Sequence, residues 1–288
     1  DSNYYALRWP YRLTDKLKPI LFRHKYIEIK KEIIIYNDLS RIDFITHIHD
    51  RHPHSRIRVR FETPITSKSY WSGTQFGAIR RKTNQFYSNK KKMKMSEKPT
   101  GIFPALEWVD YSDNDRGVSI LNQGIPSHEI RDHSIYLTLL RSVVVLSSDG
   151  IMGPCIPTPD AAEVKPYTFR YSVLPHDGDW REAASYRYGM EINMPLVSIQ
   201  VTKTENTEYK NKCLGKFSFL EISPKNILIS ALRMSEDSES VIVRFFETEG
   251  KRTVAILKFG KIIKSAVVTD LLENEIRKLG QIKNNVLQ

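Results

Sequence analysis

Residues Arg56 to Thr63 read RIRVRFET, and every second residue is apolar. In an extended chain Ile57, Val59 and Phe61 share one face, and the charged residues between them share the other. Strict alternation of this kind is typical of a β-strand with one buried face. The stretch therefore predicts a strand at the surface of a β-sandwich.

The same two-residue period, with many β-branched and aromatic residues, recurs along the chain. It predicts strands at 25–37, 134–146, 167–175, 196–203, 226–234, 240–247 and 252–259. Helical signals are few. Asp270, with Glu273 as its capping-box partner, predicts a C-terminal helix, and Trp180–Asn193 predicts one short helical turn. Many strands and few helices favour an all-β fold.

A polar stretch without periodicity, Thr202–Lys216, divides the chain. We predict a large β domain over residues 1–204, a linker over 205–216 and a small β-sandwich over 217–288. At 288 residues with 40 % hydrophobic content, the chain is long enough for two such cores.

The cysteine count and glycosylation pattern bear on location. Two cysteines, Cys155 and Cys213, cannot build a disulfide framework, and the sequence contains no N-x-S/T sequon. Both favour an intracellular or prokaryotic protein, and we predict a cytoplasmic one. No apolar run reaches the roughly 18–20 residues of a membrane span, so we expect no membrane partner.

The net charge of +11 raises the question of nucleic acid. Arg80–Lys98 contains eight Lys or Arg and one Glu, a net of +7, which leaves +4 for the rest of the chain. An excess confined to one loop is typical of a solvated or docking surface. No RNA- or DNA-binding motif accompanies it, so we predict no nucleic-acid partner.

Four histidines, His47, His49, His52 and His54, fall within eight residues. In a strand His47 and His49 share a face and could bind zinc if a third ligand were supplied. The spacing matches no standard zinc motif. The alternative, which we favour, is a polar turn whose imidazoles bond the backbone and carboxylates such as Asp50.

Two acidic clusters and one aromatic cluster remain. Asp110–Gly117 and His176–Glu182 each contain carboxylates that could act as a glycosidase pair, but Asp and Gly are also ordinary turn residues, and turns are favoured. Ser69–Arg81 brings Tyr70 and Trp71 near Gln75, a combination that suits a sugar face and its hydroxyls. Most aromatic residues of a β-sandwich lie in its core, so these features alone favour a core position for Tyr70 and Trp71.

In order, several segments resemble the C-terminal half of glycoside hydrolase family 38, the α-mannosidases. They are His49–Pro64 (HDRHPHSRIRVRFETP), Tyr70–Arg81 (YWSGTQFGAIRR), Phe103–Gly124 (FPALEWVDYSDNDRGVSILNQG), Ile135–Ser142 (IYLTLLRS), Phe169–Ala183 (FRYSVLPHDGDWREA) and Phe219–Lys251. The resemblance implies a β-supersandwich similar to galactose mutarotase, followed by a smaller β-sandwich domain. The family usually continues past the position of Gln288, so we expect a truncated chain or an unpaired edge.

The resemblance also implies a function. Family members hydrolyse α-linked mannose with retention, using an aspartate nucleophile, a carboxylic acid and a catalytic zinc in an N-terminal part that nothing here resembles. We therefore expect no cofactor in this chain, zinc in the missing catalytic domain, and no activity of the isolated chain. Expected sugar contacts are Tyr70, Trp71, Gln75, Asp110, Asp113 and Arg116. The histidines are expected to be bystanders.

The expected partners are the N-terminal catalytic domain and mannose-containing glycans, with self-association as an alternative. A half-enzyme should expose an apolar docking face. A free-standing carbohydrate-binding module is the second hypothesis, since fold does not fix function. A third, a mutarotase-like enzyme, requires His176 or the 47–54 cluster to face a carboxylate.

Overall fold

The computed structural model describes residues 4–6, 27–50, 55–84, 100–145, 156–162, 165–200, 216–280, 282 and 284–287. Two compact units make up the chain: Asp1–Gln75 with Ile79–Pro195, and Phe76–Ala78 with Leu196–Gln288. Strands dominate both units, so the all-β prediction is confirmed. Among the described residues, no helix has the length and hydrophobicity of a transmembrane span.

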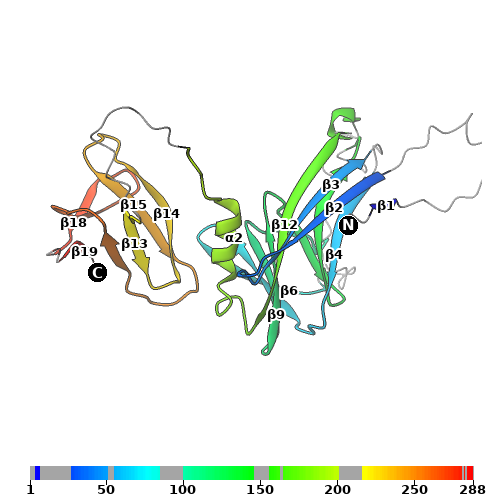
Figure 1. The fold of residues 1–288 in the computed structure, drawn as a ribbon, viewed down its shortest axis with the longest axis horizontal. Coiled ribbons are helices and arrows are strands. Elements are labelled where there is room, and N and C mark those ends of the chain that lie inside the picture. The colour runs from blue at the N-terminus through cyan, green and yellow to red at the C-terminus, as the bar shows by residue number, and fades with distance from the viewer. Residues whose placement is uncertain are drawn as a thin grey trace, which may run out of the picture. The chain divides into compact units, whose positions relative to one another are not determined.

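The first unit contains two sheets (Figure 1). The larger has the order β1-β2-β3-β12-β9-β8-β5-β6, and the smaller β4-β11-β10-β7. Their bounds are β1 Tyr4–Ala6, β2 Ile27–Ile35, β3 Ile42–Asp50, β4 Ser55–Glu62, β5 Ser69–Thr74, β6 Gly77–Lys82, β7 Phe103–Pro104, β8 Trp108–Ser112, β9 Arg116–Asn122, β10 Ser127–Arg131, β11 Ser134–Ser142 and β12 Pro166–Asp177.

The main core lies between the two sheets. Its buried residues come from both, for example Ile120 of β9 and Leu137 of β11, and Val59 and Phe61 of β4 pack against it. The alternation of β4 is therefore confirmed: its apolar face is inward and its arginines face outward. Burial of this apolar face stabilises the folded state by about 25 cal/mol per Å² of apolar surface removed from water.

A second buried layer covers the opposite face of the larger sheet. Trp108 and Leu121, on neighbouring strands, are buried with Trp180 and Tyr186 from the segment that follows β12. Helix α2, Ser185–Asn193, contacts β8 and β9. In Figure 1 it lies to the left of β12 and β9, with β4 to their right. Gly189 of α2 leaves room for Glu107, because a Cβ there would lie 3.1 Å from the Glu107 Cβ.

The second unit contains a three-stranded sheet and two hairpins. The sheet order is β13-β16-β19, and the pairs are β14–β15 and β17–β18. The bounds are β13 Leu220–Ser223, β14 Ile227–Met234, β15 Val241–Glu247, β16 Ile256–Phe259, β17 Val267–Thr269, β18 Glu275–Lys278 and β19 Val286–Leu287. One short 3-10 helix, Pro159–Ala162, belongs to the first unit.

Most predicted strands are confirmed, and two predictions are wrong. The helical turn predicted within Trp180–Asn193 is present but longer, since α2 contains nine residues. Residues 196–200 contain no strand, although LVSIQVTK alternates. The predicted C-terminal helix is the β17–β18 hairpin instead. The Asp270 side chain accepts backbone N–H groups from Leu272 and Asn274, each at 2.9 Å, so it closes a turn in place of capping a helix. The predicted linker, apart from Lys216, lies outside the described residues.

Candidate functional site

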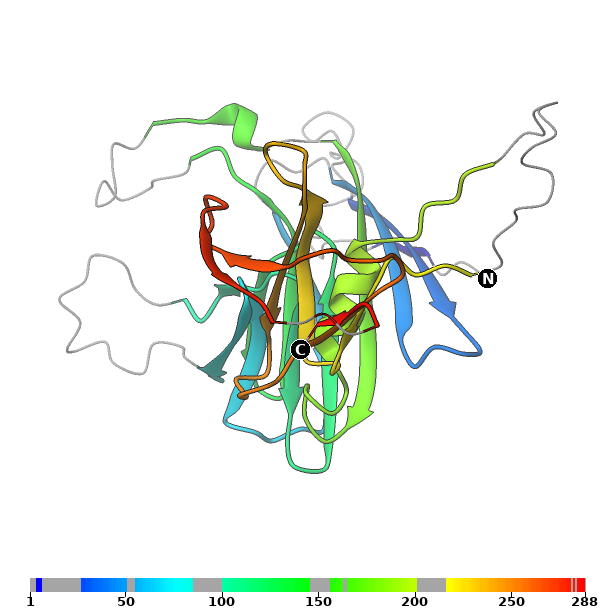
Figure 2. The same cartoon turned by 90° about the vertical axis from the view of Figure 1, so that its left-hand side faces the viewer.

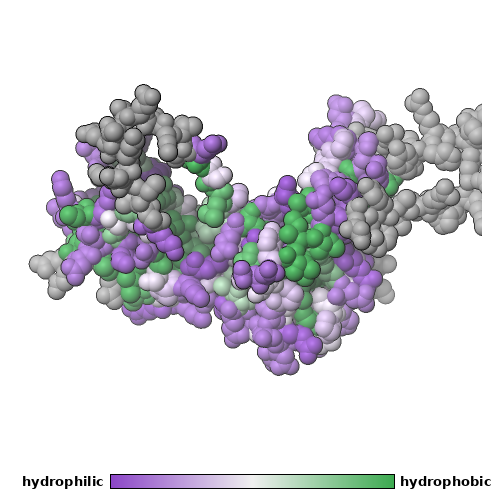
Figure 3. All heavy atoms as spheres, in the orientation of Figure 1, coloured by the Kyte–Doolittle hydropathy of each residue, from purple (hydrophilic) through white to green (hydrophobic). Residues whose placement is uncertain are grey.

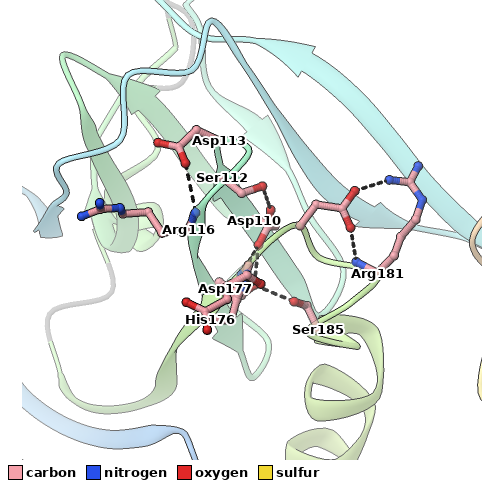
Figure 4. A network of polar contacts seen from close by, with 10 residues as sticks. Asp110, Ser112, Asp113, Arg116, His176, Asp177, Arg181 and Ser185 are labelled. Carbon is pink, nitrogen blue, oxygen red and sulfur yellow. Dashed lines mark hydrogen bonds and ion pairs between the residues drawn. The ribbon is translucent and has the colours of Figure 1, made fainter.

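Two sequence motifs that lie far apart along the chain meet at one end of the larger sheet. The first is the β8–β9 hairpin (WVDYSDNDRGV), whose tip lies at the lower end of the first unit in Figures 1 and 2. The second is the PHDGDWREA segment at the end of β12, which pairs with β9 from Tyr171 to Asp177. Five polar side chains join them, which we name the Asp110 cluster: Asp110, Ser112, Ser119, His176 and Ser185. Figure 4 shows Asp110, Ser112, His176 and Ser185 of this cluster.

Asp110 is the centre of this cluster and has no exposed surface. Its Oδ1 accepts a hydrogen bond from Ser112 at 2.5 Å, and its Oδ2 accepts one from Ser119 at 2.7 Å. His176 Nε2 lies 2.7 Å from the same Oδ2. A buried carboxylate needs such partners, because an unpaired charge in the interior costs several kcal/mol.

His176 is held between two acceptors. Nε2 faces Asp110, and Nδ1 lies 3.1 Å from the backbone carbonyl oxygen of Asp177. The doubly protonated ring can donate to both. Burial opposes a charge on this ring, but the hydrogen bond and negative charge of Asp110 outweigh it and raise the pKa of His176. The cluster thus favours an ion pair inside the protein.

The Ser, His and Asp side chains do not form a nucleophilic triad. In a triad the carboxylate and the serine bind opposite ring nitrogens. Here Ser119 Oγ lies 3.2 Å from Nε2, the nitrogen that already faces Asp110. Ser119 and Ser185 are fully buried and 2.6 Å apart. The arrangement locks β8, β9, β12 and α2 together, and its Asp110, Ser119 and Ser185 have no exposed surface.

Two glycines fit this arrangement. A Cβ on Gly117 would lie 2.1 Å from His176 Cε1, so only glycine lets the imidazole cross the hairpin. Gly178 adopts φ of +63°, a left-handed conformation that favours glycine, and its N–H donates to the Asp115 carbonyl at 3.3 Å. The PHDGD segment therefore turns closely over the β8–β9 hairpin.

An aromatic stack continues from the cluster. The Trp180 ring lies 4.9 Å from Trp108 and 5.6 Å from Trp71. The Arg181 guanidinium lies 4.4 Å from the Trp180 ring and 4.8 Å from the Trp71 ring, and Asp179 accepts its N–H at 2.6 Å. Cation–π contact of this kind fixes Arg181 over both indoles. One face of Trp71 is therefore already occupied.

The six residues predicted to contact sugar lie in different environments. Tyr70 is in the main core, 2 % exposed, and burial raises the pKa of its hydroxyl. Asp110 is enclosed, so neither it nor Tyr70 presents an exposed atom for a direct contact. Trp71 is half-buried and Gln75 is exposed in the β5–β6 turn. Their sugar contacts stay predictions.

Asp113 and Arg116 lie at the tip of the β8–β9 hairpin. Asp113 Oδ1 accepts the backbone N–H groups of Asp115 and Arg116, each at 3.0 Å, and these bonds lower the pKa of its carboxyl. The second Asp113 oxygen and the exposed Arg116 side chain remain at the surface. The turn interpretation of this acidic cluster is thus supported for Asp113, with Arg116 presented beside it.

The histidine cluster is only partly described. His47 and His49 alternate along β3 with the buried Thr46 and Ile48, so the two histidines share the opposite face of the strand, as expected. His47 Nδ1 is 2.9 Å from Thr168 Oγ1, and Nε2 is 3.4 Å from Glu32. His52 and His54 lie outside the described residues. Within the described part, no group of three His, Cys, Asp or Glu is arranged to hold a metal.

Sequence reasoning missed Ser119, Ser185 and Arg181, and it named His176 only for the mutarotase alternative. His176 does face a carboxylate, but within a closed cluster. Trp180 and Arg181 both lie in GDWREA, which belongs to a segment that carries the family resemblance, so the sequence did point to them. Ser119 could have been found only from the register, which places it directly opposite Asp110 in the β8–β9 pair.

The comparisons with known proteins agree with the motif order. The C-terminal domain of glycosyl hydrolases family 38 matches residues 15–160, and that family's C-terminal β-sandwich domain matches residues 226–286. The chain belongs to glycosyl hydrolase family 38. The predicted resemblance to the C-terminal part of this family is confirmed.

Relatives of this family 38 chain carry mannosidase names. It is 22 % identical to human "Alpha-mannosidase 2C1" over 85 % of this chain and 21 % of that protein. It is 26 % identical to "Alpha-mannosidase G" of Dictyostelium discoideum over 78 % of this chain and 19 % of that protein. The chain thus spans about a fifth of the length of these curated relatives.

Solved structures show the same fold. The crystal structure of an α-mannosidase from Enterococcus faecalis V583 matches with a TM-score of 0.74 and 22 % identity, over 88 % of this chain and 27 % of that one. A second family 38 protein from Enterococcus faecalis matches with a TM-score of 0.72 and 21 % identity, over 88 % of this chain and 28 % of that one.

Proposed function

We propose that the chain is the C-terminal β module of an α-mannosidase, which braces the catalytic part and contributes contacts to its sugar cleft. The observation that carries this proposal is the match of both family 38 C-terminal domains, in order, over residues 15–160 and 226–286. The relatives named as α-mannosidases extend far beyond the matched region. The groups that cleave mannosides therefore belong to the remaining part.

An uncovered apolar strand face supports docking of another part. Ile27 and Ile29 of β2 pack against the main core. Ile33 and Ile35 share their face by the two-residue period, yet they are 59 % and 75 % exposed. Figure 3 shows hydrophobic residues gathered on the visible side of the first unit, where Figure 1 places β2 and β12. Surfaces of this kind mark protein interaction sites.

The sugar contacts in this proposal come from the hairpin tip. The Asp110 cluster holds β8 and β9 rigid from behind, and Asp113 fixes the turn that presents Arg116. A guanidinium can donate several hydrogen bonds to sugar hydroxyls. Trp71 and Gln75 are secondary candidates, and Tyr70 and Asp110 would act only by supporting the surface.

The isolated chain is proposed to be inactive. Asp110, Ser119 and Ser185 are fully buried, and the described residues supply no three-ligand set for zinc. A catalytic zinc, if this enzyme uses one as the family resemblance implies, is assigned to the catalytic part. Location in the cytoplasm is supported by the two cysteines and the lack of sequons.

The test is association in solution. The chain is mixed with the separately expressed catalytic part of its own full-length enzyme and followed by sedimentation velocity, and mannose oligosaccharides are titrated into the chain alone by calorimetry. We expect a 1:1 complex and sugar affinity of the chain alone weaker than about 1 mM. Sugar binding well below that value, without a complex, would identify a carbohydrate-binding module. Self-association without a complex would also contradict the proposal.

A further inference from the structure

The outer face of the smaller sheet is dominated by arginine. Strands β4, β10 and β11 together contain five Arg, two Glu and no Lys or Asp. Arg56, Arg58 and Arg60 alternate along β4, and the register brings Arg131 of β10 and Arg141 of β11 to the same face. We name this surface the arginine face.

Two of these arginines stand directly opposite each other. Arg141 pairs with Arg56 across β11 and β4. Like charges in this position destabilise a sheet. Burial, followed by the neighbouring charges of Arg58 and Arg141, lowers the pKa of Arg56. The fold thus keeps an unfavourable pair that a hydrophobic or acidic residue at either position would remove.

The acidic residues of the face are already used. Glu129 is buried, is bound by Arg58 and lies 3.7 Å from Arg131, and Glu62 lies 3.3 Å from Arg60. These pairs show that carboxylates fit between the guanidiniums. Within the part of the chain that the structure describes, Arg56 and Arg141 form no ion pair, and Arg58 Nε is a buried donor without an acceptor.

Three guanidiniums lie against the half-buried ring of Tyr136. Arg58, Arg60 and Arg131 lie 4.7, 6.0 and 5.2 Å from its ring centre. Proteins that bind single-stranded nucleic acid present aromatic rings on which bases stack. The arrangement therefore favours carboxylates over nucleic acid as the partner of this face.

Protection of a sheet edge explains only part of the pattern. β4 is an edge strand of its sheet, and charged residues on edges prevent unwanted strand pairing. β10 and β11 are inner strands with neighbours on both sides. Edge protection therefore accounts for the β4 arginines, and Glu129 and Asp132 pair with Arg131, but neither explains Arg141.

We propose that the arginine face binds an acidic protein surface whose carboxylates pair with Arg56 and Arg141. Arg and carboxylate groups match in bidentate geometry, which makes Arg the usual residue for such recognition. This inference is independent of the mannosidase proposal, since it holds whichever protein carries the acidic surface.

The experiment uses the full chain and a fluorescent poly-glutamate peptide, followed by anisotropy at low and moderate salt. The test variants are Arg56→Glu/Arg141→Glu and, as a milder pair, Arg56→Gln/Arg141→Gln. Both positions are exposed, so folding should survive, which tryptophan fluorescence checks. The matched control is Lys261→Glu/Lys264→Glu, two exposed lysines in the second unit with the same charge change.

We expect the charge-reversed pair to weaken peptide binding at least about tenfold and the control less than about twofold. The glutamine pair should fall between them. Equal losses in test and control variants would overturn the proposal, because binding would then follow net charge alone. A phosphate-rich oligonucleotide that binds this face while the peptide does not would overturn it in favour of nucleic acid.

Discussion

The Asp110 cluster and the arginine face place charges in opposite situations. In the first, one buried carboxylate lies 2.5–2.7 Å from a histidine nitrogen and two serine hydroxyls, so both of its oxygens have hydrogen-bond partners. In the second, two arginines oppose each other at the surface, and neither forms an ion pair among the residues that the structure describes. Buried charges that are paired stabilise the fold, whereas exposed charges without an ion-pair partner are available to bind another molecule. The predictions that follow test this difference.

The largest effect is expected from Asp110→Asn. The change removes the charge that faces His176 in a buried site and should cost about 3 kcal/mol of unfolding free energy. Urea unfolding followed by tryptophan fluorescence measures it, because all four tryptophans belong to the first unit. Asp115→Asn, at the exposed hairpin tip, is the control and should change stability by less than about 0.5 kcal/mol. A loss below 1 kcal/mol in Asp110→Asn would refute a buried ion pair.

Gly117→Ala should cost about 2 kcal/mol, because its Cβ would meet the His176 ring and the packed cluster cannot move freely. Gly77→Ala is the matched glycine change, since nothing lies within 4 Å of its added Cβ. The same unfolding assay compares the two. Equal stabilities would mean that His176 does not cross the hairpin at Gly117.

Arg116→Ala tests the tip of the same hairpin. In the full-length enzyme we expect kcat/KM for an α-mannoside to fall about tenfold or more, since a hydrogen bond from a charged group contributes about 1.5–3 kcal/mol. The stability of the chain should not change. Exposed Lys68→Ala is the control. Unchanged kcat/KM would remove Arg116 from the sugar contacts.

The pH dependence of stability separates the two buried histidines. The raised pKa of His176 adds stability below the unfolded value of about 6.5, and this is lost as pH rises through the folded pKa. His128 behaves in the opposite way. Burial, with a smaller effect of Arg81, lowers its pKa to about 4. The folded state therefore favours the neutral ring, and the stability that this ring contributes is lost as pH falls from 6.5. Unfolding free energy should therefore decline above pH 6.5 in the wild type.

Asp110→Asn provides the check on that decline. Above pH 6.5 His128 is mostly neutral in both folded and unfolded chains. The decline in unfolding free energy there therefore reflects the loss of the proton from His176. The variant should show a flatter profile there. A decline of equal size in wild type and variant would assign it to other groups.

The smallest effect is expected on the arginine face. Arg141→Ala relieves repulsion with Arg56 and should change stability by no more than about 0.5 kcal/mol, in the stabilising direction. Thermal unfolding measures it against Arg170→Ala, an exposed arginine on β12. A loss above 1 kcal/mol would mean that Arg141 has a structural partner.

Alternation along single strands predicted the fold class, because a strand with one buried face records its orientation in every second residue. Strand 56–63 is the clearest case. The same rule failed at 196–200, where alternation exists without a neighbouring strand. It also failed at Asp270, where a side chain that suits a helix cap closes a hairpin turn instead.

The candidate site was harder to predict, because its residues meet through register and not through sequence spacing. Asp110 and His176 stood in two of the segments that carry the family resemblance, but their contact depends on β12 pairing with β9. Tyr70 and Asp110 were expected as sugar contacts from the family resemblance, and both are buried. The arginine face needed pairing across three strands, which no single stretch of sequence reveals.

The central claim, that this chain supports a catalytic part it does not contain, is tested most directly by hydrolysis of a chromogenic α-mannoside. The purified chain is assayed with added zinc, alone and together with the catalytic part of its enzyme. We predict no turnover by the chain alone and turnover when the two parts are combined. Turnover by the chain alone that a chelator abolishes would contradict the account.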